Sequence, residues 1–96
     1  MYVTATGVSY TNTLNYNANG GAGEPNSDSK TVNYPLTKLN HNVSTNGPST
    51  APVETGYDYT FAGWYDDAKT GTKISGTVAV GSDCATTNQS KTLYAH

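Results

Sequence analysis

The segment YDYTFAGWYDD, residues 57–67, constrains the fold more than any other, because it carries the only Phe and the only Trp of the chain. Thr, Ser, Asn and Gly together make up 44 of the 96 residues, so few large apolar side chains are available to fill an interior. Aromatic side chains bury roughly 150–250 Å² each and dominate the energetics of small domains. The segment therefore predicts a strand that contributes Phe61 and Trp64 to the core.

Alternation of apolar and polar residues extends this interpretation to the rest of the chain, because period two is the mark of a strand with one buried face. It predicts strands over residues 11–17, 29–34, 72–80 and 91–96. The first two flank the Gly-rich turn NANGG and predict an antiparallel hairpin. The predicted core residues are Leu14, Tyr16, Val32, Tyr34, Phe61, Trp64, Ile74, Val78 and Leu93.

The length of 96 residues predicts one domain, residues 1–96, with its core over about residues 12–96. Residues 1–11 are expected to be an extra strand or a leader. Residues 36–56 form a long irregular crossover, which begins with a short helix near Leu36 to Asn42 because Leu36, Leu39 and Val43 are spaced by three and four. The fold class is α+β, mostly β, with four to five strands.

Charge and hydropathy exclude two classes of partner. The net charge is −2, there is no Arg, and the five Lys are scattered, whereas nucleic-acid binders cluster Lys and Arg. No run of 18 apolar residues exists to insert into a membrane. Cys84 is the single cysteine, which excludes an internal disulfide. It is either an inert residue in a turn-rich segment or a reactive or intermolecularly linked thiol.

The adjacent aspartates Asp66 and Asp67 are candidates for acid–base or calcium chemistry. Neighbours on a strand point to opposite faces, so they do not face each other across a cleft, and DDAKTG offers too few ligands for calcium. The stretch is predicted to be a turn in which the aspartates accept backbone N–H groups. His41 and His96 lack zinc spacing, and His41 is expected in solvent, between Asn40 and Asn42. No catalytic, cofactor-binding or metal residue is predicted.

Exposed tyrosines are the remaining candidates for ligand contact. Trp64 and Tyr65 point to opposite faces of a strand, so the sequence leaves the environment of Tyr65 open. Tyr57, Tyr59 and Tyr65 are the predicted contacts with a partner. Three or more tyrosines gathered in one exposed patch, counting also Tyr2 and Tyr10, would favour a binding function, and scattered tyrosines would favour a spacer.

Four stretches occur in a fixed order and carry a resemblance: LNYNANGGAGEP, SKTVNY, TGYDYTFAGWYDDAKTGTKIS and TLYAH. Together they resemble the Listeria–Bacteroides repeat of bacterial surface proteins, also described as the internalin B-repeat type, over about residues 12–96. The chain departs from that pattern in three places. The 36–56 connection is longer, two residues are added in TGYDYTFAGW, and the closing Trp of the pattern would follow His96.

The resemblance implies a β-grasp-like fold, a small mixed sheet with a crossover packed on one face. It also implies a non-enzymatic repeat module of a bacterial cell-surface or secreted protein, which acts as a spacer or presentation unit without a cofactor. Its expected partners are neighbouring repeats or domains of the same chain. The alternative is an adhesion module that recognises a host protein or glycan through exposed Tyr residues or a strand edge.

Overall fold

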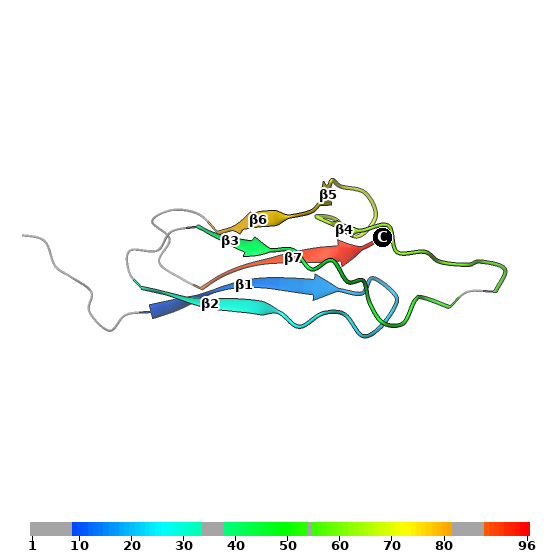
Figure 1. Cartoon of the computed structure of the whole chain (residues 1–96), viewed down its shortest axis with the longest axis horizontal. Coiled ribbons are helices and arrows are strands. Elements are labelled where there is room, and N and C mark those ends of the chain that lie inside the picture. The colour runs from blue at the N-terminus through cyan, green and yellow to red at the C-terminus, as the bar shows by residue number, and fades with distance from the viewer. Residues whose placement is uncertain (1–8, 34–37, 54, 82–87) are drawn as a thin grey trace, which may run out of the picture.

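The computed structural model describes residues 9–33, 38–53, 55–81 and 88–96 of the chain. Within these residues the chain forms seven strands and no helix (Figure 1). No helix in this part of the chain is long and apolar enough to cross a membrane. The strands are β1 (Ser9–Asn17), β2 (Asp28–Asn33), β3 (Leu39–Asn42), β4 (Trp64–Tyr65), β5 (Lys73–Ile74), β6 (Thr77–Val80) and β7 (Gln89–Ala95).

The strands form two sheets. Five of them make a mixed sheet in the order β2-β1-β7-β4-β5, and β3 pairs with β6 in a separate two-stranded sheet. The predicted hairpin of β1 and β2 is confirmed as antiparallel. β7 runs parallel to β1 in the centre of the sheet, from the pair Asn12 and Gln89 to the pair Asn17 and Tyr94. The prediction of a mostly β domain with a mixed sheet is confirmed. The α+β class is not, because the described residues contain no helix, and their seven strands in two sheets exceed the four to five predicted.

The crossover differs from the sequence prediction. Leu39–Asn42 is a strand that pairs antiparallel with β6, so the helix predicted near Leu36 to Asn42 is wrong over these four residues. The burial pattern alternates along the stretch, because His41 and Val43 are buried and Asn40 and Asn42 are exposed. That period of two fits a strand, and the ladder to β6 outweighs the helical spacing of three apolar residues. Leu36 lies outside the described residues.

The aromatic segment is much less regular than predicted. Only Trp64–Tyr65 is a strand, paired with the end of β7 and with β5. The described residues of this segment before Trp64 form no strand, although Ala62 N–H donates to His96 O and Gly63 O accepts from His96 N–H. Residues 48–53 and 55–61, here called the protruding segment, extend past the end of β7 (Figure 1). Phe61 is 39 % exposed, which corrects its prediction as a core residue.

The strand predicted over residues 72–80 is split in two. Gly76 has a φ of 73°, in the left-handed region that side-chain-bearing residues rarely adopt. The break sends β5 into the five-stranded sheet and β6 into the two-stranded sheet. One sequence run therefore joins the two sheets.

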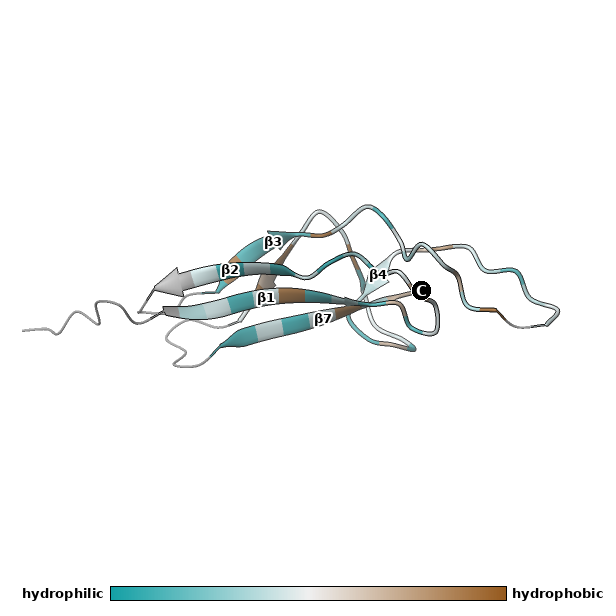
Figure 2. Cartoon of the chain, turned by 90° about the horizontal axis from the view of Figure 1, so that it is seen from below, coloured by the Kyte–Doolittle hydropathy of each residue, from teal (hydrophilic) through white to brown (hydrophobic). Residues whose placement is uncertain are grey.

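The core lies between the two sheets. Its buried members come from β1, β4, β6, β7 and the residue after β3, and Ile74 and Val78 pack against them partly buried. Figure 2 shows how little of the chain is apolar, since the strands are mostly teal and white with short brown stretches. Tyr34 and the side chain of Val32 lie outside the described residues. The buried apolar cluster is Leu14, Tyr16, Val43, Trp64, Val80, Leu93 and Ala95.

The polar tips of two core aromatics fix the crossover over the sheet. Tyr16 Oη donates to Asn42 O (3.3 Å) and accepts from the Ser44 backbone N–H (2.9 Å). Trp64 Nε1 donates to Asn46 O (3.1 Å), and its ring lies 4.8 Å from that of Tyr16. Buried Tyr and Trp side chains need such partners. The same two residues therefore build the core and hold the chain that covers it.

Candidate functional site

A groove opens at the end of the five-stranded sheet where β1 and β7 finish, and both arms of the protruding segment are anchored there. The first arm is held by Ala22 and Thr50, which exchange two backbone hydrogen bonds of 2.9 and 3.0 Å. In the second arm, the Ala62 N–H donates to His96 O (2.6 Å) and the His96 N–H donates to Gly63 O (3.0 Å). The segment is thus tied at both ends while its middle projects.

The groove is mainly apolar and has a volume of about 200 Å³. Asn19 and Thr60 bring polar groups to it, with His96 at the end of the chain. None of its lining residues is an Asp, Glu, Lys or Arg. Such a surface suits neutral or apolar groups, because a charged ligand would lose hydration there without a compensating partner. The other lining residues are Ala18, Pro48, Ala51, Pro52, Tyr59, Phe61 and Ala95.

Phe61 joins the groove to the core. Its ring meets Trp64 edge-on, with the centroids 5.4 Å apart and the planes at 65°, a favourable geometry for aromatic pairs. The ring also lies directly over Gly47, where an added Cβ would come within 2.6 Å of it. A glycine at position 47 is therefore needed for Phe61 to lie this close to the backbone.

The three tyrosines predicted to contact a partner do not form one surface. Tyr57 and Tyr59 lie on the protruding segment, 67 % and 44 % exposed. Tyr65 is half-buried and lies on the face of β4 opposite to Trp64. Tyr10 is half-buried near the start of β1, far along the sheet from the groove. Tyr2 lies outside the described residues.

Tyr65 has a defined partner on the outer face of the sheet. Its ring stacks on that of His96, with centroids 3.9 Å apart and an interplanar angle of 8°. Nε2 of His96 donates to the backbone oxygen of Asp67 (2.7 Å). The end of the chain is thereby joined to the turn that follows β4.

The two adjacent aspartates organise this turn. Asp66 Oδ1 accepts the Thr72 N–H (2.7 Å), and Asp67 Oδ1 accepts the N–H groups of Lys69 (2.9 Å) and Thr70 (3.1 Å). Those two backbone donors hold the pKa of the Asp67 carboxyl below its ordinary value. The contacts match the predicted turn, in which Asp side chains accept nearby backbone N–H groups. In the described part of the chain, no group of three or more His, Cys, Asp or Glu is placed to hold a metal ion.

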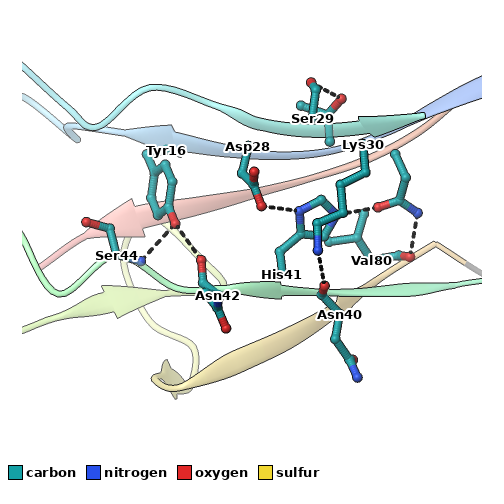
Figure 3. Close-up of polar contacts among 11 residues, drawn as sticks. Tyr16, Asp28, Ser29, Lys30, Asn40, His41, Asn42, Ser44 and Val80 are labelled. Atoms are coloured by element: carbon teal, nitrogen blue, oxygen red, sulfur yellow. Dashed lines mark hydrogen bonds and ion pairs between the residues drawn. The ribbon is translucent and has the colours of Figure 1, made fainter. Parts of the chain in front are cut away.

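A buried polar cluster connects the two sheets (Figure 3). His41 in β3 has no exposed surface, so the expectation that it lies in solvent is wrong. Its Nδ1 lies 2.8 Å from Asp28 Oδ2 in β2 and its Nε2 lies 2.5 Å from Asn12 Oδ1 in β1. Asn12 Nδ2 in turn donates to Val80 O in β6 (2.9 Å). The cluster therefore bonds four strands of the two sheets to one another.

The geometry of the cluster indicates a structural role. Asn12 Oδ1 faces the ring because Asn12 Nδ2 is committed to Val80 O. Both ring nitrogens of His41 consequently face oxygen atoms, Asp28 Oδ2 and Asn12 Oδ1, so neither nitrogen is left without a hydrogen-bond partner. A His beside an Asp resembles part of a catalytic triad, but a nucleophile would have to occupy the place that Asn12 holds. The ring is also sealed from any substrate.

Sequence reasoning missed this cluster, although a signal for it was present. Asn12 shares the even parity of Leu14 and Tyr16, which marks the inward face of β1. His41 likewise shares the parity of Leu39 and Val43 in β3. A polar residue at an inward position of a strand predicts a buried hydrogen-bonded pair. Cys84, for which the sequence left an inert residue and a reactive or linked thiol as alternatives, lies outside the described residues.

The molecule so described is a small β domain with an apolar groove at one end and structural polar clusters elsewhere. Comparison with curated proteins and with solved structures returned no match. The family model described as the Listeria-Bacteroides repeat domain matches residues 12–96. This repeat is typical of bacterial surface proteins. The chain belongs to the Listeria-Bacteroides repeat family.

Proposed function

We propose that this domain is a non-enzymatic spacer or presentation module of a bacterial cell-surface or secreted protein. The observation that carries the proposal is the parallel pairing of β1 and β7 in the centre of the sheet. Two parallel neighbours begin at the same end of a sheet, so the chain enters β1 at one end and leaves β7 at the other (Figure 1). Copies joined in series therefore add length instead of folding back.

The same pairing supports a mechanical role. A force applied through the chain pulls β1 from its beginning and β7 from its end, in opposite directions along the strand axes. The ladder bonds between β1 and β7 lie across that direction, so they bear the load together and do not open one after another. The side chain of Asn12 bonds β1 to β6, and Asp28 bonds β2 to His41 in β3. Both contacts add hydrogen bonds between the two sheets.

The strand arrangement also supports the finer description of the fold as β-grasp-like. An antiparallel hairpin, β1 and β2, is followed by a crossover and by a last strand, β7, that lies parallel to β1. In this chain the crossover contributes the β3 strand to a second sheet over the core. This arrangement makes the entry strand β1 and the exit strand β7 neighbours in the sheet.

Array length tests the proposal directly. We expect the maximum dimension of arrays of one, two and four copies, measured by small-angle X-ray scattering, to grow by a constant increment. The nine residues of β1 alone span about 30 Å, so each copy should add at least that length. A maximum dimension that barely grows from two copies to four would show that the modules pack into a globule, and it would overturn the spacer function.

Adhesion is the second candidate, and the exposure of Tyr57 and Tyr59 beside the groove favours it. Tyr65 belongs to another face and stacks on His96, so one small ligand would not contact all three tyrosines. The scattering of the described tyrosines favours the spacer. Binding of a host protein or glycan that is lost in Tyr57→Ser and retained in Tyr65→Ser would support adhesion instead.

A further inference from the structure

The exposed apolar surface of this domain gathers at one place. Among the described residues, the exposed large hydrophobic side chains are Val53 (97 %), Tyr57 (67 %), Tyr59 (44 %) and Phe61 (39 %). All four belong to the protruding segment, next to the apolar groove that Phe61 and Tyr59 line. Apolar residues that cluster on a surface, unlike scattered ones, mark interaction sites. This end of the molecule is therefore a candidate interaction surface.

The direction in which the chain leaves β7 indicates which part of an array would lie next to the groove. β7 runs toward this end, and Ala95 and His96 themselves line the groove. The protruding segment extends farther in the same direction than the end of β7 (Figure 1). A chain that continues from β7 leaves beside the groove, so a module that follows it would lie on the side of the protruding segment. β1 begins at the opposite end, so the same relation would recur at every junction.

We propose that the groove, together with Val53, Tyr57 and Tyr59, is the docking surface for the next copy of this module in an array. This inference rests on the proposed spacer function and deepens it by naming the contact that orients consecutive copies. Membership of a repeat family and the position of the groove at the exit of the chain both favour a second copy over other occupants. The neutral lining fits the surface of a protein that carries few charges, 12 % of its residues.

The contact joins one end of a module to the opposite end of the next, so it is a head-to-tail interface that continues without closing. Modules in such arrays are stabilised by their neighbours as well as by their own contacts. Tethering makes a weak contact sufficient, because a short linker holds its partner at an effective concentration of about 1 mM. A contact with an intrinsic Kd of about 0.1 mM would then be populated roughly tenfold over the undocked form.

A tandem of two copies, joined head to tail, tests the proposal against the single chain. We expect the first copy to unfold at a higher urea concentration than the single chain, by an amount equivalent to about a tenfold change in its unfolding equilibrium constant. The double variant Val53→Ser and Tyr57→Ser, placed in the first copy, should remove this increment. Both side chains are exposed, so the variant should leave the fold of its own module intact.

The matched control is the same double variant in the second copy, whose groove has no copy after it. It should leave the increment unchanged. Segmental isotope labelling supplies a readout independent of stability. Amide resonances of residues 55–61 should shift relative to the single chain when the first copy is labelled, and should not shift when the second is. Two copies that unfold independently, or a double variant with equal effect in either copy, would overturn the proposal.

The outcomes also separate this inference from the spacer function. Independent copies that still lengthen by a constant increment in scattering would reject the docking surface and keep the spacer as a flexible string of modules. Arrays that fail to lengthen while the first copy is stabilised would reject the spacer and keep the contact.

Discussion

Two aromatic residues are buried in the sheet body, here meaning the two sheets and the core between them, and the aromatic residues of the protruding segment are exposed. In the sheet body, Tyr16 and Trp64 are buried and each polar tip has a backbone partner in the crossover. In the protruding segment, Tyr57 and Phe61 are exposed although they belong to the same sequence run as Trp64. The difference lies in the neighbours. Trp64 pairs with Ala95 in β7, whereas the described residues of the run before Gly63 belong to no strand.

This comparison shows that an aromatic residue in a polar chain is buried only where a second layer covers it. The two-stranded sheet and the crossover lie over the inward face of β1 and β7, and Val43 and Val80 close the core there. The protruding segment has backbone anchors at its two ends. We interpret the first region as the source of stability and the second as the source of interaction. Five measurements would test this division.

The largest effect is expected at the centre of the sheet body. Trp64→Ala should destabilise the domain by about 3–5 kcal/mol, because it removes the largest fully buried side chain. A loss of that size approaches the whole stability of a small domain. Urea unfolding monitored by circular dichroism would measure it. A Trp64→Ala variant that folds with an unchanged midpoint would contradict the division.

The second-largest loss of stability is expected in the buried polar cluster of the sheet body. Asn12→Ala leaves Nε2 of His41 and the Val80 carbonyl without their partner, and an unsatisfied buried polar group costs about 1–3 kcal/mol. Asn40→Ala is the matched control, because the Asn40 side chain is exposed in β3. Chemical denaturation of the two variants would compare them. Equal losses would show that the buried bonds contribute nothing specific.

Phe61 lies at the boundary between the two regions, and its effect should be intermediate. Its ring packs on Trp64 but stays 39 % exposed, so Phe61→Ala should cost roughly 1–2 kcal/mol from partial loss of burial. The urea midpoint would fall between those of Trp64→Ala and the wild type. A loss as large as that of Trp64→Ala would place Phe61 functionally in the core, despite its exposure.

The turn after β4 allows a test by pH. Backbone N–H groups lower the pKa of Asp67, so its ionised form favours the folded state. This contribution is present above the pKa of the unfolded chain and is lost as pH falls through the lower pKa of the folded state. Asp67→Asn should therefore be slightly less stable at neutral pH, and the difference should vanish in acid. Urea midpoints at several pH values would show whether the two curves converge.

The smallest effect is expected in the protruding segment of the single chain. Val53→Ser should change the stability by no more than about 0.5 kcal/mol, because the Val53 side chain is 97 % exposed. Thermal unfolding of the isolated module would measure the change. A clear destabilisation would show that the segment packs on its own domain, and the separation between a stabilising body and an interacting segment would fail.

Local patterns predicted those parts of the fold that depend on one strand or one turn. The alternation of apolar and polar residues in residues 11–17 predicted that Leu14 and Tyr16 share one face of the strand. The Gly-rich turn predicted the hairpin of β1 and β2. The adjacent aspartates indicated the turn that they organise. Each of these features is decided by residues close together in sequence. Alternation and turn chemistry report such features directly.

Which strands pair, and therefore which residues form the candidate site, depends on contacts between residues far apart in sequence. Tyr16 pairs with Leu93 in the parallel ladder, and His41 receives partners from β1 and β2. Leu39–Asn42 is a strand because it pairs with β6, and Phe61 is exposed because it lies on the protruding segment, outside the core between the two sheets. A sequence by itself determines which face of a strand is apolar. Contacts between distant residues determine what covers that face, because their free energy depends on the whole assembled sheet.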